Sequence, residues 1–153
     1  MQLRNSDGTT FNSVRPDLTR NLMEETGLDN AQLSVLVEEF YSRVQTDPLL
    51  GPIFAARVTD WPAHMERLTA FWSSVALMTG QYHGAPVPAH ADLPVAWAHF
   101  ERWLMLFRET ANRVCSPDGA AHVIERAERI ARSLHIAVQD AAATAPGTIP
   151  NLR

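Results

Sequence analysis

The fold of this chain is decided by the stretch Gly80-Gln81-Tyr82-His83-Gly84-Ala85-Pro86-Val87-Pro88-Ala89-His90-Ala91-Asp92-Leu93-Pro94. Its three prolines exclude a long helix, because proline lacks the amide proton and clashes with the preceding helical turn. Segments with apolar residues at helical spacing lie on both sides of it. The sequence therefore predicts that His90 sits on a short, stiff segment between two pairs of helices.

Two long helices are predicted ahead of this stretch. The first covers about residues 30–46, with its N-cap at position 29 or 30 and its end at Asp47-Pro48. The second covers about residues 60–78 and has a proline in its first turn, where proline is tolerated. Between them, residues 49–54 form an apolar corner with two helix breakers, which we expect to be buried against other parts of the chain.

Two further helices are predicted after the stretch, over about residues 95–114 and 117–142. Residues 1–28 form an N-terminal extension, loose at its start and then a short helix. Prolines and a glycine predict a flexible tail at residues 143–153. No alternating strand pattern appears, so the expected fold is all-α. Its main domain, residues 29–142, can pack as two antiparallel helix pairs with a pocket between them.

The composition is that of an ordinary globular domain. The chain has 153 residues, of which 46% are hydrophobic and 20% charged, and a net charge of −4 at pH 7. This acidic balance gives no support for a nucleic-acid or membrane partner. The single cysteine excludes an internal disulfide and a cysteine-rich zinc site, and it favours a reducing cytoplasm. The polar first ten residues do not read as a secretory signal, and no run of about 18 apolar residues could span a membrane.

Three hydrogen-bond donors fall on the apolar faces of different predicted helices: Tyr41, His64 and Trp103. Each of them taken alone is more often a core residue whose polar atom finds a nearby carbonyl. A buried phenol or indole needs such a partner. Three donors on helices that should face one another can also converge on one pocket, which suits a bound acceptor with developing negative charge.

His90 is the candidate metal ligand. Imidazole is the commonest metal ligand among side chains, although a histidine taken at random is more often structural. No second ligand lies near His90 in the sequence, which suits an iron whose in-plane ligands come from a porphyrin. The remaining histidines are expected at the surface or on helix flanks: His83, His99, His122 and His135.

Five segments, in their order and spacing, resemble the group III truncated haemoglobins. They are Phe40-Tyr41, Asp47-Pro48-Leu49-Leu50-Gly51-Pro52-Ile53-Phe54, Trp61-Pro62-Ala63-His64 with Phe71-Trp72, Tyr82-His83-Gly84-Ala85-Pro86 to His90-Ala91-Asp92-Leu93-Pro94, and His99-Phe100-Glu101-Arg102-Trp103-Leu104-Met105-Leu106-Phe107. The likeness runs from about residue 26 to about residue 134. The sequence lacks the Gly-Gly pairs typical of the other two truncated groups, which favours group III. The N-terminal extension is longer than the family pattern.

The resemblance implies a two-over-two helical sandwich around haem b. It implies His90 as the proximal iron ligand and Tyr41, His64 and Trp103 as the distal wall, which stabilises the bound ligand. The other haem contacts that it implies are Phe54, Arg67, Leu68, Phe71, Trp72 and Tyr82, with Arg67, Trp72 and Tyr82 beside the propionates.

The expected function is the binding of diatomic ligands such as O2, NO or CO, with peroxide as a further ligand. Two donors in a dry pocket, at roughly 1.5 kcal/mol each, would slow ligand loss by about a hundredfold. Slow release argues against bulk O2 transport and favours redox chemistry, peroxidase-like or NO dioxygenase, with a reductase as a candidate partner. The alternative is a cofactor-free all-α interaction or regulatory module in which the same aromatic residues are plain core.

Overall fold

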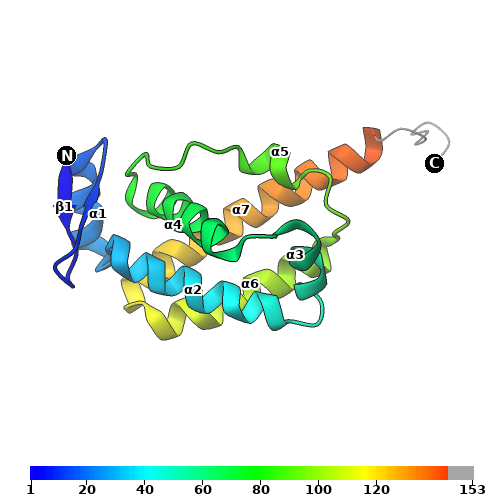
Figure 1. Ribbon diagram of the computed structural model, residues 1–153, viewed down its shortest axis with the longest axis horizontal. Coiled ribbons are helices and arrows are strands. Elements are labelled where there is room, and N and C mark those ends of the chain that lie inside the picture. Colours follow the sequence, from blue (N-terminus) through cyan, green and yellow to red (C-terminus); the bar gives the residue numbers. More distant parts are fainter. Residues whose placement is uncertain (145–153) are drawn as a thin grey trace.

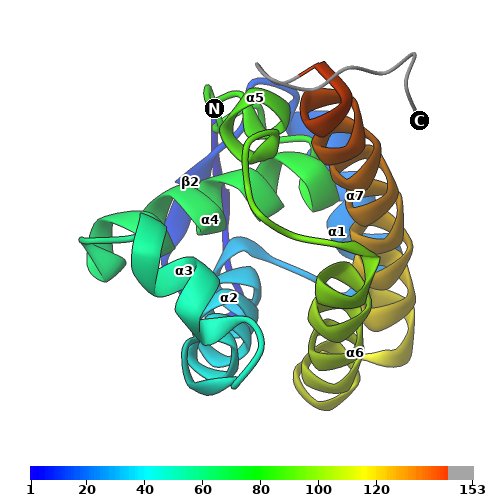
Figure 2. The same ribbon diagram turned by 90° about the vertical axis from the view of Figure 1, so that its right-hand side faces the viewer.

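The structure, a computed structural model, describes residues 1–144 as a helical bundle preceded by a small β-hairpin (Figure 1). Its elements are β1 (Gln2–Arg4), β2 (Thr10–Asn12), α1 (Pro16–Thr26), α2 (Asn30–Thr46), α3 (Gly51–Arg57), α4 (Trp61–Leu77), α5 (Pro86–His90), α6 (Trp97–Val114) and α7 (Pro117–Thr144). The expected all-α class and the four long helices are confirmed. In Figure 2, α6 and α7 run side by side, while α2 and α3 lie across from them and α5 lies above.

The helix boundaries follow local signals in the sequence. Asp29 and Asp60 cap α2 and α4, since their carboxylates accept from the backbone N–H of Gln32 at 2.8 Å and of Ala63 at 3.1 Å. Helix α4 ends at Leu77, because Met78 adopts a left-handed conformation with a φ of 57° and its amide donates to the Ser74 carbonyl. The expected stop, Gly80, lies beyond this cap and is also left-handed, with a φ of 72°. Helix α7 continues to Thr144, just beyond its expected end. The rest of the predicted flexible tail, residues 145–153, lies outside the described part of the chain.

Of the two short helices, α3 corrects the sequence prediction and α5 agrees with it. The expected corner at residues 49–54 begins α3, because both supposed breakers fall in the first turn of that helix. Proline is well placed there, and Gly51 lets the turn close on α2: a Cβ at this position would come within 2.7 Å of the Gln45 carbonyl oxygen. Helix α5 is a single turn that starts at Pro86, so the exclusion of a long helix from this stretch is confirmed.

The start of the chain is a hairpin, and the expectation that it is loose is wrong. Leu3 pairs with Phe11 across the two strands, and both side chains are buried. The backbone N–H and the hydroxyl of Ser6 both donate to Asp29, at 2.9 and 2.7 Å, which ties the hairpin to the start of α2. Three-residue strands are too short to show an alternating pattern. The turn residues Asp7-Gly8, with a φ of 92° at Gly8, were the available signal.

The segment after the hairpin is bonded to the end of α4. The Val14 amide donates to the Thr79 carbonyl at 3.0 Å, and the Thr19 hydroxyl donates to the Leu77 carbonyl at 2.7 Å. These bonds satisfy backbone groups that the end of a helix leaves without partners. The N-terminal extension therefore closes one end of the bundle.

The hydrophobic core lies where α2, α4, α6 and α7 meet. Its fully buried side chains include Leu33, Leu36, Val37, Phe40, Val44, Trp72, Leu77, Phe107, Ala111, Val123 and Ala127. Cys115 is buried at the end of α6, and burial raises the pKa of its thiol to about 11, which keeps it protonated. Among the described residues, no helix is both long and apolar enough to cross a membrane.

His122 joins α7 to α4, although its sequence context predicts a surface or flank position. Its ring is half-buried, and Nε2 lies 2.8 Å from the carbonyl oxygen of Ala76. Since a carbonyl oxygen can only accept, Nε2 carries the proton and donates. Burial lowers the pKa of His122 below its ordinary value of 6.5, and the bond to Ala76 offsets this only in part.

Acidification is expected to destabilise the fold through His122. Its pKa is lower in the folded chain, so the unfolded chain takes up the proton more readily and the unfolding free energy falls as the pH drops below 6.5. Glutamine at this position can donate to the same carbonyl without titrating. His122→Gln should therefore flatten the fall in unfolding free energy between about pH 6.5 and pH 5, measured by urea unfolding. A pH slope equal to that of the unchanged protein would contradict this account.

Candidate functional site

A cavity of about 330 Å³ lies between the helix pairs, lined mainly by apolar side chains. Helices α2 to α7 all contribute to its wall. Every predicted site residue except Trp72 lines it: Tyr41, Phe54, His64, Arg67, Leu68, Phe71, Tyr82, His90 and Trp103. Residues from opposite ends of the sequence thus meet at one concave, largely apolar site with few polar groups, the usual form of a cofactor pocket.

His90 lines this cavity, and one of its two ring nitrogens is hydrogen-bonded to the backbone. Its Nδ1 lies 2.6 Å from the Pro86 carbonyl oxygen, one helical turn earlier in α5. Because that oxygen can only accept, Nδ1 carries the proton and Nε2 keeps the lone pair that a metal needs. A hydrogen bond of this kind fixes the ring orientation and raises the basicity of the ligating nitrogen. No group of three or more metal-ligating side chains occurs among residues 1–144.

These features fit a haem group. A porphyrin needs an apolar slot and one protein nitrogen with a free lone pair, and the cavity provides His90 Nε2 as such a ligand atom. Arg67 is an exposed cation on the cavity lining, in a position to balance a haem carboxylate. The hydrogen-bond donors elsewhere on the cavity wall would then influence which ligands bind to the iron.

Tyr41 and Trp103 provide two donors held rigidly by neighbouring aromatic rings. Tyr41 is only 4% exposed, and Phe40 packs against both rings, with centroid distances of 4.6 Å to Tyr41 and 5.3 Å to Trp103. Burial raises the pKa of the Tyr41 phenol, and hydrogen bonding with the Trp103 and Trp72 side chains offsets this only in part. The phenol therefore stays protonated at neutral pH and remains able to donate.

His64 adds a third donor on α4. Its Nδ1 lies 3.5 Å from the Arg67 guanidinium, which can only donate, so the proton of the neutral ring is on Nε2. Burial, the charge of Arg67 and the proximity of His90 all lower the pKa of His64. The ring is therefore neutral at pH 7, and it combines an acceptor nitrogen towards Arg67 with a donor nitrogen for the pocket.

Trp72 does not line the cavity, which corrects its assignment as a haem contact. It is 1% exposed and stacks on Phe107 with a centroid distance of 4.9 Å. Its position follows from helix geometry, because each residue is turned by about 100° from the one before it, so Trp72 faces the core while Phe71 faces the cavity. Trp72 supports the site indirectly, through its hydrogen bonding with Tyr41.

His99 lines the cavity, although the sequence placed it at the surface or on a helix flank. Its Nδ1 accepts from the Ala96 amide at 3.0 Å, so the proton of the neutral ring is on Nε2. The signal was its spacing of four from Trp103, which puts both on one helix face. His135 was also expected at the surface, yet its ring packs against Trp97 and Phe100. The other lining residues that sequence reasoning missed are Leu50, Ile53, Pro86, Ala89, Leu93, Val95, Phe100, Ile130, Ala131 and Leu134.

Comparison with known proteins gives consistent matches. Residues 21–136 match the bacterial-like globin family. The group 3 truncated hemoglobin ctb of Campylobacter jejuni is 34% identical over 109 residues, which cover 68% of this chain and 86% of the relative. The group 2 truncated hemoglobin YjbI of Bacillus subtilis is 32% identical over 85 residues, 54% of this chain and 64% of the relative. A crystal structure of group III truncated hemoglobin from Campylobacter jejuni superposes with a TM-score of 0.68 at 33% identity, covering 72% of this chain and 91% of that one.

The helical bundle, the histidine-bearing cavity and these matches define a globin. The chain belongs to the bacterial-like globin family and, within it, to the group III truncated haemoglobins, as its sequence predicts. Globins bind haem and, through its iron, small gaseous ligands such as O2. Haem-based ligand binding is therefore the general function of this chain.

Proposed function

We propose that the protein binds haem b through His90 and uses it for redox chemistry on O2, NO or peroxide rather than for bulk O2 transport. The observation that supports this most directly is the free Nε2 of His90 in the same cavity as three donors, Tyr41, His64 and Trp103. When bound, the haem supplies an iron that coordinates diatomic ligands and exchanges electrons. The choice among O2, NO, CO and peroxide then depends on the donors.

In this proposal the donors retain the ligand. Tyr41 and Trp103 offer an O–H and an N–H in a pocket where low polarity strengthens each hydrogen bond. Packing fixes both rings before a ligand arrives. The single N–H of Trp103 interacts with the Tyr41 oxygen in the structure and would be shared with a bound ligand. Long retention suits a protein that converts its ligand and conflicts with one that delivers it. Turnover would require an electron donor, such as a reductase.

His64 has a separate role in the proposal. It is half-buried beside the exposed Arg67, so it stands between the pocket and the solvent. A neutral imidazole there can donate a proton from Nε2 into the pocket while Nδ1 takes up a proton from the solvent side. We assign His64 to proton supply and to gating, and Arg67 and Tyr82 to the haem propionates. The buried single cysteine is in keeping with a reducing compartment, and we propose a cytoplasmic location on that ground.

Titration of the purified chain with haem tests the proposal. We expect one equivalent of haem to produce a Soret band that shifts on reduction and on addition of CO. Consumption of peroxide or NO by the loaded protein, compared with free haem, then separates redox chemistry from simple binding. A folded protein that stays colourless would favour the cofactor-free interaction module instead.

A further inference from the structure

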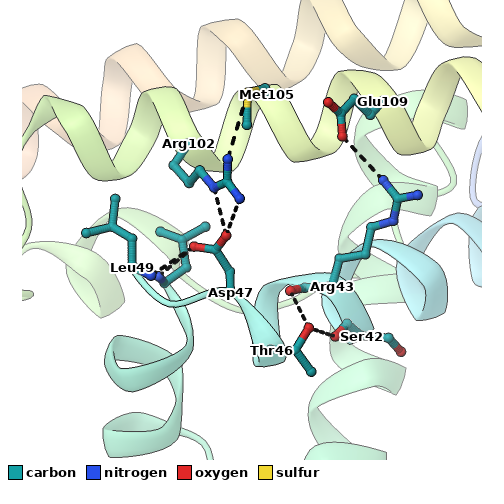
Figure 3. Close-up of polar contacts among 9 residues, drawn as sticks. Ser42, Arg43, Thr46, Asp47, Leu49, Arg102, Met105 and Glu109 are labelled. Atoms are coloured by element: carbon teal, nitrogen blue, oxygen red, sulfur yellow. Dashed lines mark hydrogen bonds and ion pairs between the residues drawn. The ribbon is translucent and has the colours of Figure 1, made fainter.

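A buried carboxylate joins three elements of the cavity wall (Figure 3). Asp47 follows α2 directly, and its side chain is only 2% exposed. Its Oδ2 accepts from the backbone N–H of Leu49 at 3.1 Å and of Leu50 at 3.0 Å, immediately before α3. Its Oδ1 accepts a hydrogen bond from Nε of Arg102 on α6 at 2.7 Å, and Nη2 of the same guanidinium lies 2.7 Å from that oxygen as an ion pair. One side chain thus holds α2, α3 and α6 together.

Each of these elements carries a wall residue close to the junction. Leu50 lines the cavity itself, and Phe54 lies one helical turn further along α3. Trp103 is the next residue after Arg102, and Tyr41 lies on α2 ahead of Asp47. Asp47 and Arg102 do not line the cavity, so any effect they have on a ligand must pass through these neighbours.

The junction is held by charge-assisted bonds that persist at neutral pH. Burial alone would raise the pKa of Asp47, but the bond from Arg102, the amides of Leu50 and Leu49 and the charge of Arg102 lower it below 3.8. The carboxylate is therefore ionised, and its bonds are stronger than those between neutral groups. A buried carboxylate that lost Arg102 would keep its charge without a counter-charge, so the surrounding segments would have to shift.

We infer that the Asp47–Arg102 pair is a positioning device for the distal wall: it fixes Trp103 and α3 relative to α2, and thereby sets how long a bound ligand is retained. This inference rests on the proposed function, because it concerns the same pocket. Both are positioning residues, since neither touches the haem or its ligand. Two nitrogens of the planar guanidinium approach the same carboxylate oxygen, which fixes direction as well as distance, whereas a single point charge would not.

The chain contains a matched control. Arg43 and Glu109 form a second ion pair between α2 and α6, at 3.5 Å, also visible in Figure 3. Their side chains are 33% and 57% exposed, and neither residue lines the cavity. Loss of this pair removes an α2–α6 ion pair without touching the junction at α3. It therefore reports the general effect of weakening this helix contact.

The experiment compares Arg102→Gln, Arg102→Lys and Arg43→Gln in haem-reconstituted protein. We expect Arg102→Gln to raise the O2 dissociation rate by about threefold to tenfold, as partial loss of one donor would, and to shift the C–O stretching frequency of the CO adduct. Arg102→Lys keeps the positive charge but lacks the planar guanidinium, so its O2 dissociation rate and C–O stretching frequency should lie between those of Arg102→Gln and the unchanged protein. Arg43→Gln should stay within about twofold of the unchanged protein.

A second readout needs no haem. In protein labelled with ¹⁵N-tryptophan, solvent exchange of the Trp103 indole proton should quicken in Arg102→Gln and not in Arg43→Gln. If Arg102→Gln matches Arg43→Gln in the C–O stretch and in indole exchange, the inference is overturned. Should Arg102→Gln fail to fold, Arg102→Lys supplies the same comparison with smaller changes. Absence of a Soret band in the unchanged protein would refute the proposed function, while indole exchange would still decide whether the pair positions Trp103.

Discussion

Replacement of His90 by glycine is expected to abolish stable haem binding, and added imidazole is expected to restore it. His90 is the only histidine in α5, and its Nδ1 bond to Pro86 leaves Nε2 free for the iron. Without the bond from His90 Nε2 to the iron, only the apolar wall would hold the haem. We therefore expect the haem affinity to fall by about a hundredfold or more, equivalent to about 2.8 kcal/mol. Free imidazole can occupy the space left by the side chain and supply the missing nitrogen.

Haem titration followed by the Soret band, with and without imidazole, measures this effect. His83→Gly is the matched control, because His83 lies in the same proline-rich stretch, is exposed and does not line the cavity. It should bind haem like the unchanged protein. An intact Soret band in His90→Gly without imidazole, with an unaltered CO adduct, would show that another residue ligates the iron.

The second large effect is expected from Tyr41→Phe and Trp103→Phe. Each removes one donor from a buried pocket, and a hydrogen bond of about 1.5 kcal/mol corresponds to roughly a tenfold faster dissociation of O2. The two residues contact one another through hydrogen bonding, so their effects should not add fully in the double variant. Stopped-flow dissociation rates for O2 and CO measure the change. CO should respond less, because it carries less negative charge than O2.

Trp97→Phe provides the control for Trp103→Phe, as the same substitution on the same helix. Trp97 packs against His135 and Phe100 but does not line the cavity. We expect its O2 dissociation rate to stay within about twofold of the unchanged protein. Dissociation rates unaffected by both Tyr41→Phe and Trp103→Phe would remove the donors from the proposed mechanism and leave retention to steric enclosure.

Much of the fold could be predicted because its signals are local. Asp29 and Asp60 act as caps whichever way the helices pack. The end of α4 was predicted only approximately, because Met78 rather than Gly80 adopts the left-handed cap conformation. Helix α3 was missed for the same reason, since Gly51 and Pro52 read as breakers until the structure places them in a first turn. Proline is allowed in the first turn of a helix and excluded from its interior. Whether Pro52 breaks or begins a helix therefore cannot be decided until the first residue of that helix is known.

The site was less accessible to sequence reasoning because it depends on which way each helix face points. Tyr41 and Trp103 were identified as donors on apolar faces, and the structure brings both to one cavity. Trp72 follows Phe71 directly, and only the packing against Phe107 shows that it faces the core. The Asp47–Arg102 pair links residues 55 positions apart, and nothing in the local sequence around either residue indicates the partner.

The β-hairpin and the segment after it limit where this chain can be joined to a relative in a chimera. The match to the family begins at residue 21, but the Val14 amide and the Thr19 hydroxyl already pair with carbonyl groups at the end of α4, and Ser6 with Asp29 at the start of α2. The cooperative unit is therefore larger than the shared segment. A chimera joined to a relative at residue 21 would lose these bonds, and with them the bonds from the Asn30 and Ala31 amides to Asn5, so the start of α2 and the end of α4 would be exposed to water.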